Sequence, residues 1–209
     1  MNKAIIARKL GMTQVFSPEG KVIPVTVVEA GPCPVVQIKT LERDGYTAIK
    51  LGFSEVAEKY VNKPDLGQFK KAGVKPQKYL KEFRTDAEGV EVGSVITVET
   101  FAEGDKVDVS GLTRGRGYTG VIQRWNAHRL KSTHGVGPVH REVGSMGANS
   151  SPSRVFKQKH MPGQYGHEKV TVQNLEIVKV DTARNALLIK GAIPGAVGGI
   201  VTISKSVKA

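Results

Sequence analysis

Residues 111–169 form a basic, glycine-rich stretch with neither strand nor helix periodicity, except that residues 118–126 have the pattern of a short helix. The stretch holds ten of the lysines and arginines, two acids, all five histidines and ten of the 24 glycines. An irregular segment of this length does not pack inside a compact domain, so it is either disordered or ordered by something outside the chain. The folded core must therefore come from the sequence on either side.

That flanking sequence carries short β-branched runs separated by turn residues such as Asp44-Gly45 and Pro194-Gly195. We expect strands over residues 22–28, 35–39, 47–51, 95–100, 106–109, 170–180, 186–190 and 200–204. Many short strands with turns at this spacing predict a closed or nearly closed β-barrel. Between them, Pro64 and Asp65 can open a short helix that Pro76 limits.

The predicted fold is thus mainly β, with a small α-containing insertion and a long irregular basic extension. The barrel body is expected over residues 1–110 and 166–209, with the insertion near residues 55–90. The basic extension is expected over residues 111–165.

The charge of the chain favours an anionic partner. The formal net charge is +12, of which residues 111–169 supply +8 (ten bases and two acids). A membrane surface is anionic too, but the sequence has no amphipathic helix with a basic face and an aromatic one. No secretory signal or spanning segment is visible, and the single Cys33 excludes an internal disulfide framework. These features predict a soluble, cytoplasmic protein in which Cys33 is a small apolar residue.

One glycine motif raises the alternative of a nucleotide-dependent enzyme. Residues 115–120 match the dinucleotide-binding pattern G-x-G-x-x-G. That fold also needs a second parallel strand ending in an acid about 20 residues further on. The sequence around His140 is instead a loop rich in glycine, proline and histidine, with Glu142 in no strand context. A glycine-rich turn that presents arginines to phosphate is the favoured interpretation.

Metal and catalytic chemistry are also disfavoured. The histidines lie at positions 128, 134, 140, 160 and 167, so none are three to five residues apart, and no cysteine or acidic cluster assists them. Ser145 lacks the glycine two residues before it that a nucleophile elbow requires. We expect no catalysis, no metal, no cofactor and no small-molecule substrate.

RNA suits the same residues better. Arginine offers forked donors for phosphate, and glycine lets the backbone approach a nucleic acid closely. The lone Trp125 has two interpretations of equal weight, a core residue or a platform for a stacked base or the RNA backbone. Phe156 and Tyr165 share this ambiguity.

Several motifs, in order along nearly the whole chain, resemble the universal large-subunit ribosomal protein L-three family in its bacterial form. The principal one comprises Phe101, Asp108, Gly111, Thr113, Gly115-Arg116-Gly117, Gly120 and Arg124. The others are Arg8-Lys9-Leu10-Gly11-Met12-Thr13-Gln14-Val15-Phe16, Arg124-Trp125-Asn126, Thr133-His134-Gly135, Gly144-Ser145-Met146-Gly147, Val170-Thr171-Val172 and Lys190-Gly191-Ala192-Ile193-Pro194-Gly195.

The resemblance implies a β-barrel of the translation-protein type and an extension that enters the large-subunit rRNA. It implies a primary rRNA-binding protein that binds near the 3′ end of that rRNA, nucleates subunit assembly and neighbours the ribosomal proteins L-fourteen and L-nineteen. The residues expected to bind RNA are Arg8, Lys9, Arg114, Arg116, Arg124, Trp125, Arg129, Lys131, His134, Arg141, Arg154, Lys157 and Lys159. The tip expected near the peptidyl transferase centre is Gly144, Ser145, Met146, Gly147, Ala148, Asn149 and Ser150.

Two positions depart from the family pattern. Ser150 stands where many bacterial relatives have a glutamine that is methylated, so this modification is not expected. His160 ends a run, Lys157-Gln158-Lys159-His160, that is usually Lys-Gly-Lys-Lys, and one fixed charge is lost. A free-standing translation factor with a similar barrel is a further alternative, although the chain has no GTP-binding P-loop.

Overall fold

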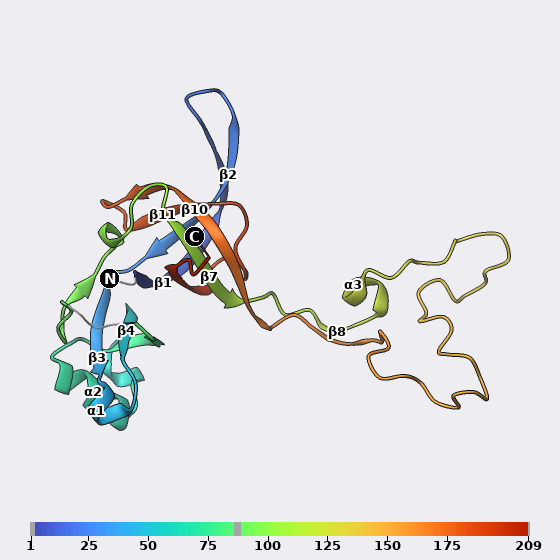
Figure 1. Cartoon of the computed structure of the whole chain (residues 1–209), viewed down its shortest axis with the longest axis horizontal. Coiled ribbons are helices and arrows are strands. Elements are labelled where there is room, and N and C mark those ends of the chain that lie inside the picture. The colour runs from blue at the N-terminus through green and yellow to red at the C-terminus, as the bar shows by residue number, and fades with distance from the viewer. Residues whose placement is uncertain (1–2, 86–88, 209) are drawn as a thin grey trace. The chain divides into compact units, whose positions relative to one another are not determined.

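The computed structural model describes residues 3–85 and 89–208. It divides into two compact units: the barrel unit, Met1–Thr113 with Lys169–Ala209, and the extension unit, Arg114–Glu168 (Figure 1). The barrel unit contains a closed six-stranded barrel, so the predicted mainly-β barrel fold is confirmed.

Six antiparallel strands close the barrel in the order β1-β12-β7-β10-β11-β2. Their bounds are β1 Ala4–Phe16, β12 Ile200–Lys205, β7 Lys106–Leu112, β10 Lys169–Asp181, β11 Ala186–Lys190 and β2 Val22–Ala30. Closure removes the unpaired edges that an open sheet would expose. Alternate residues point inward, as the buried Val107 and Val109 do on β7.

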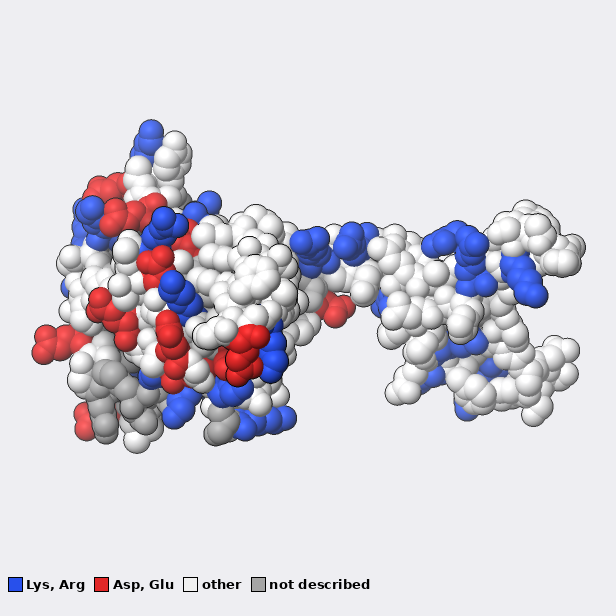
Figure 2. All heavy atoms as spheres, turned by 90° about the horizontal axis from the view of Figure 1, so that it is seen from above, with Lys and Arg blue, Asp and Glu red and all other residues white. Residues whose placement is uncertain are grey.

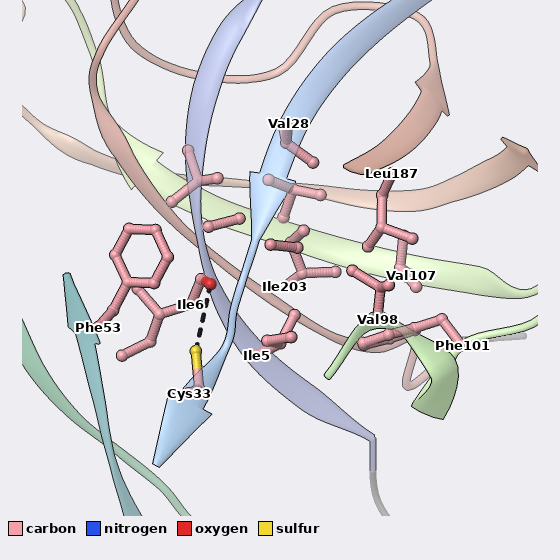
Figure 3. Close-up of a cluster of buried hydrophobic side chains, with 14 of the residues drawn as sticks. Ile5, Ile6, Val28, Cys33, Phe53, Val98, Phe101, Val107, Leu187 and Ile203 are labelled. Carbon is pink, nitrogen blue, oxygen red and sulfur yellow. Dashed lines mark hydrogen bonds between the residues drawn. The ribbon is translucent and has the colours of Figure 1, made fainter. Parts of the chain in front are cut away.

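Fully buried branched side chains from different strands fill the barrel interior, among them Ile5, Ile203, Leu187 and Val28 (Figure 3). Each side chain of this kind stabilises the fold by about 1.5–3 kcal/mol relative to exposure. Cys33 lies in the same cluster, where its Sγ donates to the Ile6 carbonyl at 3.5 Å. Burial raises the pKa of the Cys33 thiol to about 12. This burial agrees with the interpretation of Cys33 as a small apolar residue.

A smaller sheet in the same unit has the order β5-β4-β3-β6. The strands are β3 Cys33–Lys39, β4 Ala48–Glu55, β5 Gln77–Phe83 and β6 Val95–Ile96, with the short helix α1 over Leu41–Asp44 and the 3-10 helix η1 over Glu58–Tyr60. Helix α2, Lys63–Ala72, confirms the predicted helix: proline lies in its first turn, Gly73 caps its end in the left-handed conformation, and Phe69 anchors it in the core.

Apart from β5, Gln77–Phe83, where no strand was expected, two strand predictions differ from the structure. The strand expected over residues 95–100 ends at Ile96, and Val98–Thr100 forms the 3-10 helix η2. The other difference is β1, a long strand that the pattern did not predict because Arg8, Lys9 and Gly11 interrupt its apolar alternation. Gly11 lies at an irregularity in the pairing with β2, and Lys9 points inward.

The extension unit has three short elements near its two ends. Strand β8, Gly117–Thr119, pairs antiparallel with β9, Gly163–Tyr165, and helix α3 spans Val121–Trp125. The helix predicted over residues 118–126 thus exists over a shorter range, because residues 117–119 are a strand. Residues 126–162 follow an irregular path.

Candidate nucleic-acid interface

The glycine-rich motif at residues 115–120 forms a turn and then a strand. The Arg116 amide donates to the Tyr165 carbonyl at 2.8 Å, and Gly117 has a φ of 68°. The preceding strand β7 pairs only with antiparallel neighbours in the described chain, and the following helix α3 has five residues. A dinucleotide fold requires a parallel strand pair around a longer helix. The motif is therefore not a dinucleotide-binding turn.

Arg124 and Trp125 are fixed by contacts at the far end of the segment. The Arg124 guanidinium and the Trp125 indole N–H both donate to the Met161 carbonyl, each at 3.0 Å. The indole stacks on the His160 ring with centroids 4.2 Å apart and planes 4° apart. Trp125 is 42% exposed, so it is not a core residue.

Most of the basic residues of the extension unit are exposed. They are Arg114, Arg116, Arg129, Lys131, Arg141, Arg154, Lys157 and Lys159. Only Glu142 and Glu168 are acidic in this unit, so intramolecular ion pairs can neutralise at most a minority of its bases. In Figure 2 the extension shows blue surface with little red, whereas the barrel unit shows both colours. Such a surface attracts a polyanion and releases its counterions on binding.

The two flanks of the irregular loop meet at one further point. The His140 Nδ1 lies 3.0 Å from the Lys131 carbonyl, and the Leu130 amide donates to the His140 carbonyl at 3.2 Å. His134 is exposed, with a φ of 62°. This local pairing brings Lys131 and Arg141 to one part of the loop.

The expected tip, residues 144–150, is exposed throughout. Asn149 has a φ of 57°, a conformation that asparagine tolerates better than most residues, and its carbonyl accepts from the Ser153 amide at 3.2 Å. The Ser145 hydroxyl donates to the Gly147 carbonyl at 3.3 Å. Local turns of this kind hold the tip without any apolar core.

A protein-family model described as Ribosomal protein L3 matches residues 81–187, which is 107 of the 209 residues. The chain belongs to the ribosomal protein L3 family. The match spans the whole extension unit and the barrel strands β7 and β10 on either side of it. Members of this family are structural, rRNA-binding constituents of the large ribosomal subunit, and they are generally not enzymes.

Within this member of the L3 family, two predicted RNA contacts lie in the barrel unit and differ from the rest. Lys9 is 6% exposed, and its ammonium donates to the carbonyls of Ile193 and Gly195 at 2.8 and 3.2 Å. The Lys9 ammonium is thus engaged inside the barrel unit, and its assignment as an RNA contact stays a prediction that this burial disfavours. Arg8 is partly exposed but engaged by Glu29 at 3.7 Å and Ser54 at 3.2 Å.

The structure also draws attention to Tyr118, which the sequence did not single out, and gives contacts for Phe156 and His160, which it did. Tyr118 is 80% exposed on β8, and Arg154 lies over the Phe156 ring at 5.7 Å. His160 stacks on the indole of Trp125. The available signal was the mixing of aromatic and basic residues, which is typical of surfaces that stack bases.

Among the described residues, no group of three or more histidine, cysteine or acidic side chains is placed to hold a metal ion. Across the same residues, no helix is long and apolar enough to cross a membrane.

Proposed function

We propose that this L3-family chain is a primary rRNA-binding protein that binds the large-subunit rRNA near its 3′ end and nucleates assembly of that subunit. In this proposal the barrel body, residues 1–110 and 166–209, anchors the protein. The extension, residues 111–165, enters the rRNA in the cytoplasmic ribosome. The observation that carries the proposal is an exposed, irregular segment with ten bases against two acids in residues 111–169.

The RNA contacts are assigned to the cations of the extension, all of them exposed except the half-buried Arg124, with Arg8 as a secondary contact from the barrel unit. The cations are Arg114, Arg116, Arg124, Arg129, Lys131, Arg141, Arg154, Lys157 and Lys159. Arginine and lysine contacts to phosphate fix position without reading sequence, so recognition depends on the shape of the folded rRNA. The ribosomal proteins L-fourteen and L-nineteen are the proposed protein neighbours.

Filter binding of the full chain to a 3′ fragment of the large-subunit rRNA tests the RNA assignment. With about six phosphate contacts, affinity falls by orders of magnitude between 50 and 200 mM salt. A 5′ fragment of equal length is the control for location. A flat salt response, or equal affinity for both fragments, would contradict the proposal.

The tip is proposed to lie near the peptidyl transferase centre, which is itself RNA. A cleavage reagent tethered to a Ser150→Cys variant tests this in assembled subunits. Cys33 does not compete for the reagent, because it is buried and its pKa is raised to about 12. Cleavage should map to rRNA of that centre, and a Glu19→Cys variant on the β1–β2 turn should cleave elsewhere. Identical cleavage from both positions would count against the placement.

Retention on the subunit separates a structural constituent from a free-standing translation factor. The chain should remain at one copy per large subunit after a high-salt wash. Loss of the chain in that wash would favour the factor.

A further inference from the structure

The ends of the irregular loop 126–159 meet at a small cluster of side chains. Trp125 precedes the loop and His160 follows it, and their rings stack with centroids 4.2 Å apart. The carbonyl of Met161 accepts both the Trp125 indole N–H and the Arg124 guanidinium, each at 3.0 Å. A carbonyl oxygen has two lone pairs, so it can satisfy both donors.

Backbone pairing continues from this cluster. Thr119 lies opposite Gly163 in the β8–β9 pair. A Cβ at Gly163 would lie 2.4 Å from the Arg124 Nη1, so a side chain there would displace the guanidinium from this position. Arg124 also lies over the Trp125 ring at 5.0 Å. One connected group within the extension unit therefore comprises the strand pair, the Met161 carbonyl and the side chains of Arg124, Trp125 and His160.

This arrangement limits the contacts that Trp125 can make with RNA. Its indole N–H is already satisfied and His160 covers one of its faces, so the ring is committed to contacts within the protein. We propose that Trp125 and His160 are positioning residues, which form a clasp that closes the loop 126–159 in the absence of RNA. The inference rests on the proposed function and deepens it, because the loop that the clasp closes carries six of the nine phosphate contacts assigned to the extension.

We expect the clasp to preorganise the loop 126–159 for RNA binding. A loop whose ends are already held has less chain entropy to lose when its lysines and arginines settle on phosphates. The clasp itself contributes no phosphate contact. Removing it should therefore weaken RNA binding without changing the number of counterions released.

Hydrogen exchange on the RNA-free full chain tests whether the clasp exists. The amides of residues 116–119 and 163–165 should exchange slowly, while residues 127–159 exchange fast. His160→Ala should accelerate exchange at the strand pair by about tenfold or more. His160→Phe, which keeps a stacking ring without an imidazole, should retain the slow exchange. Unchanged exchange in His160→Ala would overturn the clasp.

Fluorescence of Trp125, the sole tryptophan, tests its role once RNA is added. In RNA-free protein, acrylamide should quench His160→Ala more strongly than the wild type, since one indole face opens. Addition of the rRNA fragment should leave the wild-type emission nearly unchanged. Strong quenching on RNA addition would mean that a base stacks on Trp125, and the positioning role would be wrong.

Affinity measurements separate positioning from direct contact. His160→Ala should bind the rRNA fragment about tenfold more weakly with an unchanged salt slope, and His160→Phe should restore binding. If His160→Lys restores binding and His160→Phe does not, His160 contacts phosphate directly and the inference fails. If the wild-type chain does not bind the fragment, the proposed function fails, while exchange in the RNA-free chain still decides the clasp.

Discussion

The ammonium of Lys9 donates a hydrogen bond to the backbone carbonyl of Ile193 over 2.8 Å, inside the barrel unit. A buried charge is expensive unless polar groups surround it, and here a second carbonyl, that of Gly195, also accepts. We expect Lys9→Met to lower the free energy of unfolding by roughly 2–4 kcal/mol, because it leaves both carbonyls without this donor. Urea unfolding followed by circular dichroism measures the change.

Lys21→Met is the matched control, since its side chain is 77% exposed, and it should be nearly neutral. A Lys9→Met chain that is as stable as the wild type, but has a lower salt slope in RNA binding, would return Lys9 to the RNA interface.

The acid stability of the barrel unit should depend on Asp105. The pKa of this carboxyl lies below its ordinary value, first because it accepts the Ala102 amide at 2.9 Å, and second because it pairs with the Lys3 ammonium. A carboxyl whose pKa is lower in the folded state than in the unfolded state stabilises the fold at pH values above its unfolded-state pKa of about 3.9. This stabilisation is lost as the pH falls through the folded-state pKa. Below about pH 4, urea midpoints of Asp105→Asn should therefore fall less steeply than those of the wild type. Glu103→Gln, an exposed neighbour, should follow the wild-type curve; parallel curves for Asp105→Asn would refute the assignment.

The salt dependence of RNA binding should decrease when extension cations are removed. Each lost phosphate contact reduces the slope of log K against log salt by about 0.7–0.9, so Lys157→Gln with Lys159→Gln should reduce it by about 1.4–1.8. The matched control removes the same charge from helix α2, with Lys70→Gln and Lys71→Gln, and should leave the slope unchanged. Equal effects of the two pairs would indicate attraction by overall charge rather than contacts from the extension.

Gly166 should be intolerant of a side chain. Its φ is +74°, and a Cβ there would lie 1.9 Å from the Arg114 carbonyl oxygen. Gly166→Ala should therefore disrupt the β8–β9 pair and speed exchange of its amides, while the barrel strands keep their protection. Gly67→Ala, in helix α2 with nothing within 4 Å, should instead stabilise by roughly 0.5–1 kcal/mol. Intact slow exchange at residues 163–165 in Gly166→Ala would show that the backbone adapts.

Asn149 is the sharpest test of the tip. Asn149→Asp keeps a residue that tolerates the observed φ of 57° but adds a carboxylate. Ribosomes that carry it at normal occupancy should show altered sensitivity to antibiotics that bind the peptidyl transferase centre. Asn149→Gly keeps the backbone without the charge and should have the weaker effect. Unchanged sensitivity for Asn149→Asp would place the tip elsewhere.

The barrel was predictable because its signal is local. Apolar runs over residues 22–28 and 186–190 supply buried side chains to one interior, and Pro64 marks the start of helix α2 where the structure has it. Strand β1 was missed because Lys9 reads as a surface charge. The carbonyls that accept its ammonium lie more than 180 residues away along the chain, at Ile193 and Gly195.

Contacts between residues far apart along the chain were also missed in the extension. Its charge and glycine content indicated its partner class, yet the pairing of β8 with β9 joins residues 44 to 48 positions apart, from Thr119↔Gly163 to Gly117↔Tyr165. Trp125 was ambiguous for the same reason, because its partner His160 follows 35 residues later. Neither contact leaves a periodic pattern in the sequence.

Leu112 and Lys169 face each other as the last register pair of β7 and β10, so the chain leaves the barrel and returns to it on adjacent strands. Residues 113–168 are therefore, by topology, the loop of a β-hairpin, a connection for which two to five residues would suffice. A change in the length or charge of such a loop does not alter the order of the six strands in the barrel. The part of the molecule that we propose to bind RNA can therefore change together with its RNA, while the barrel stays constant.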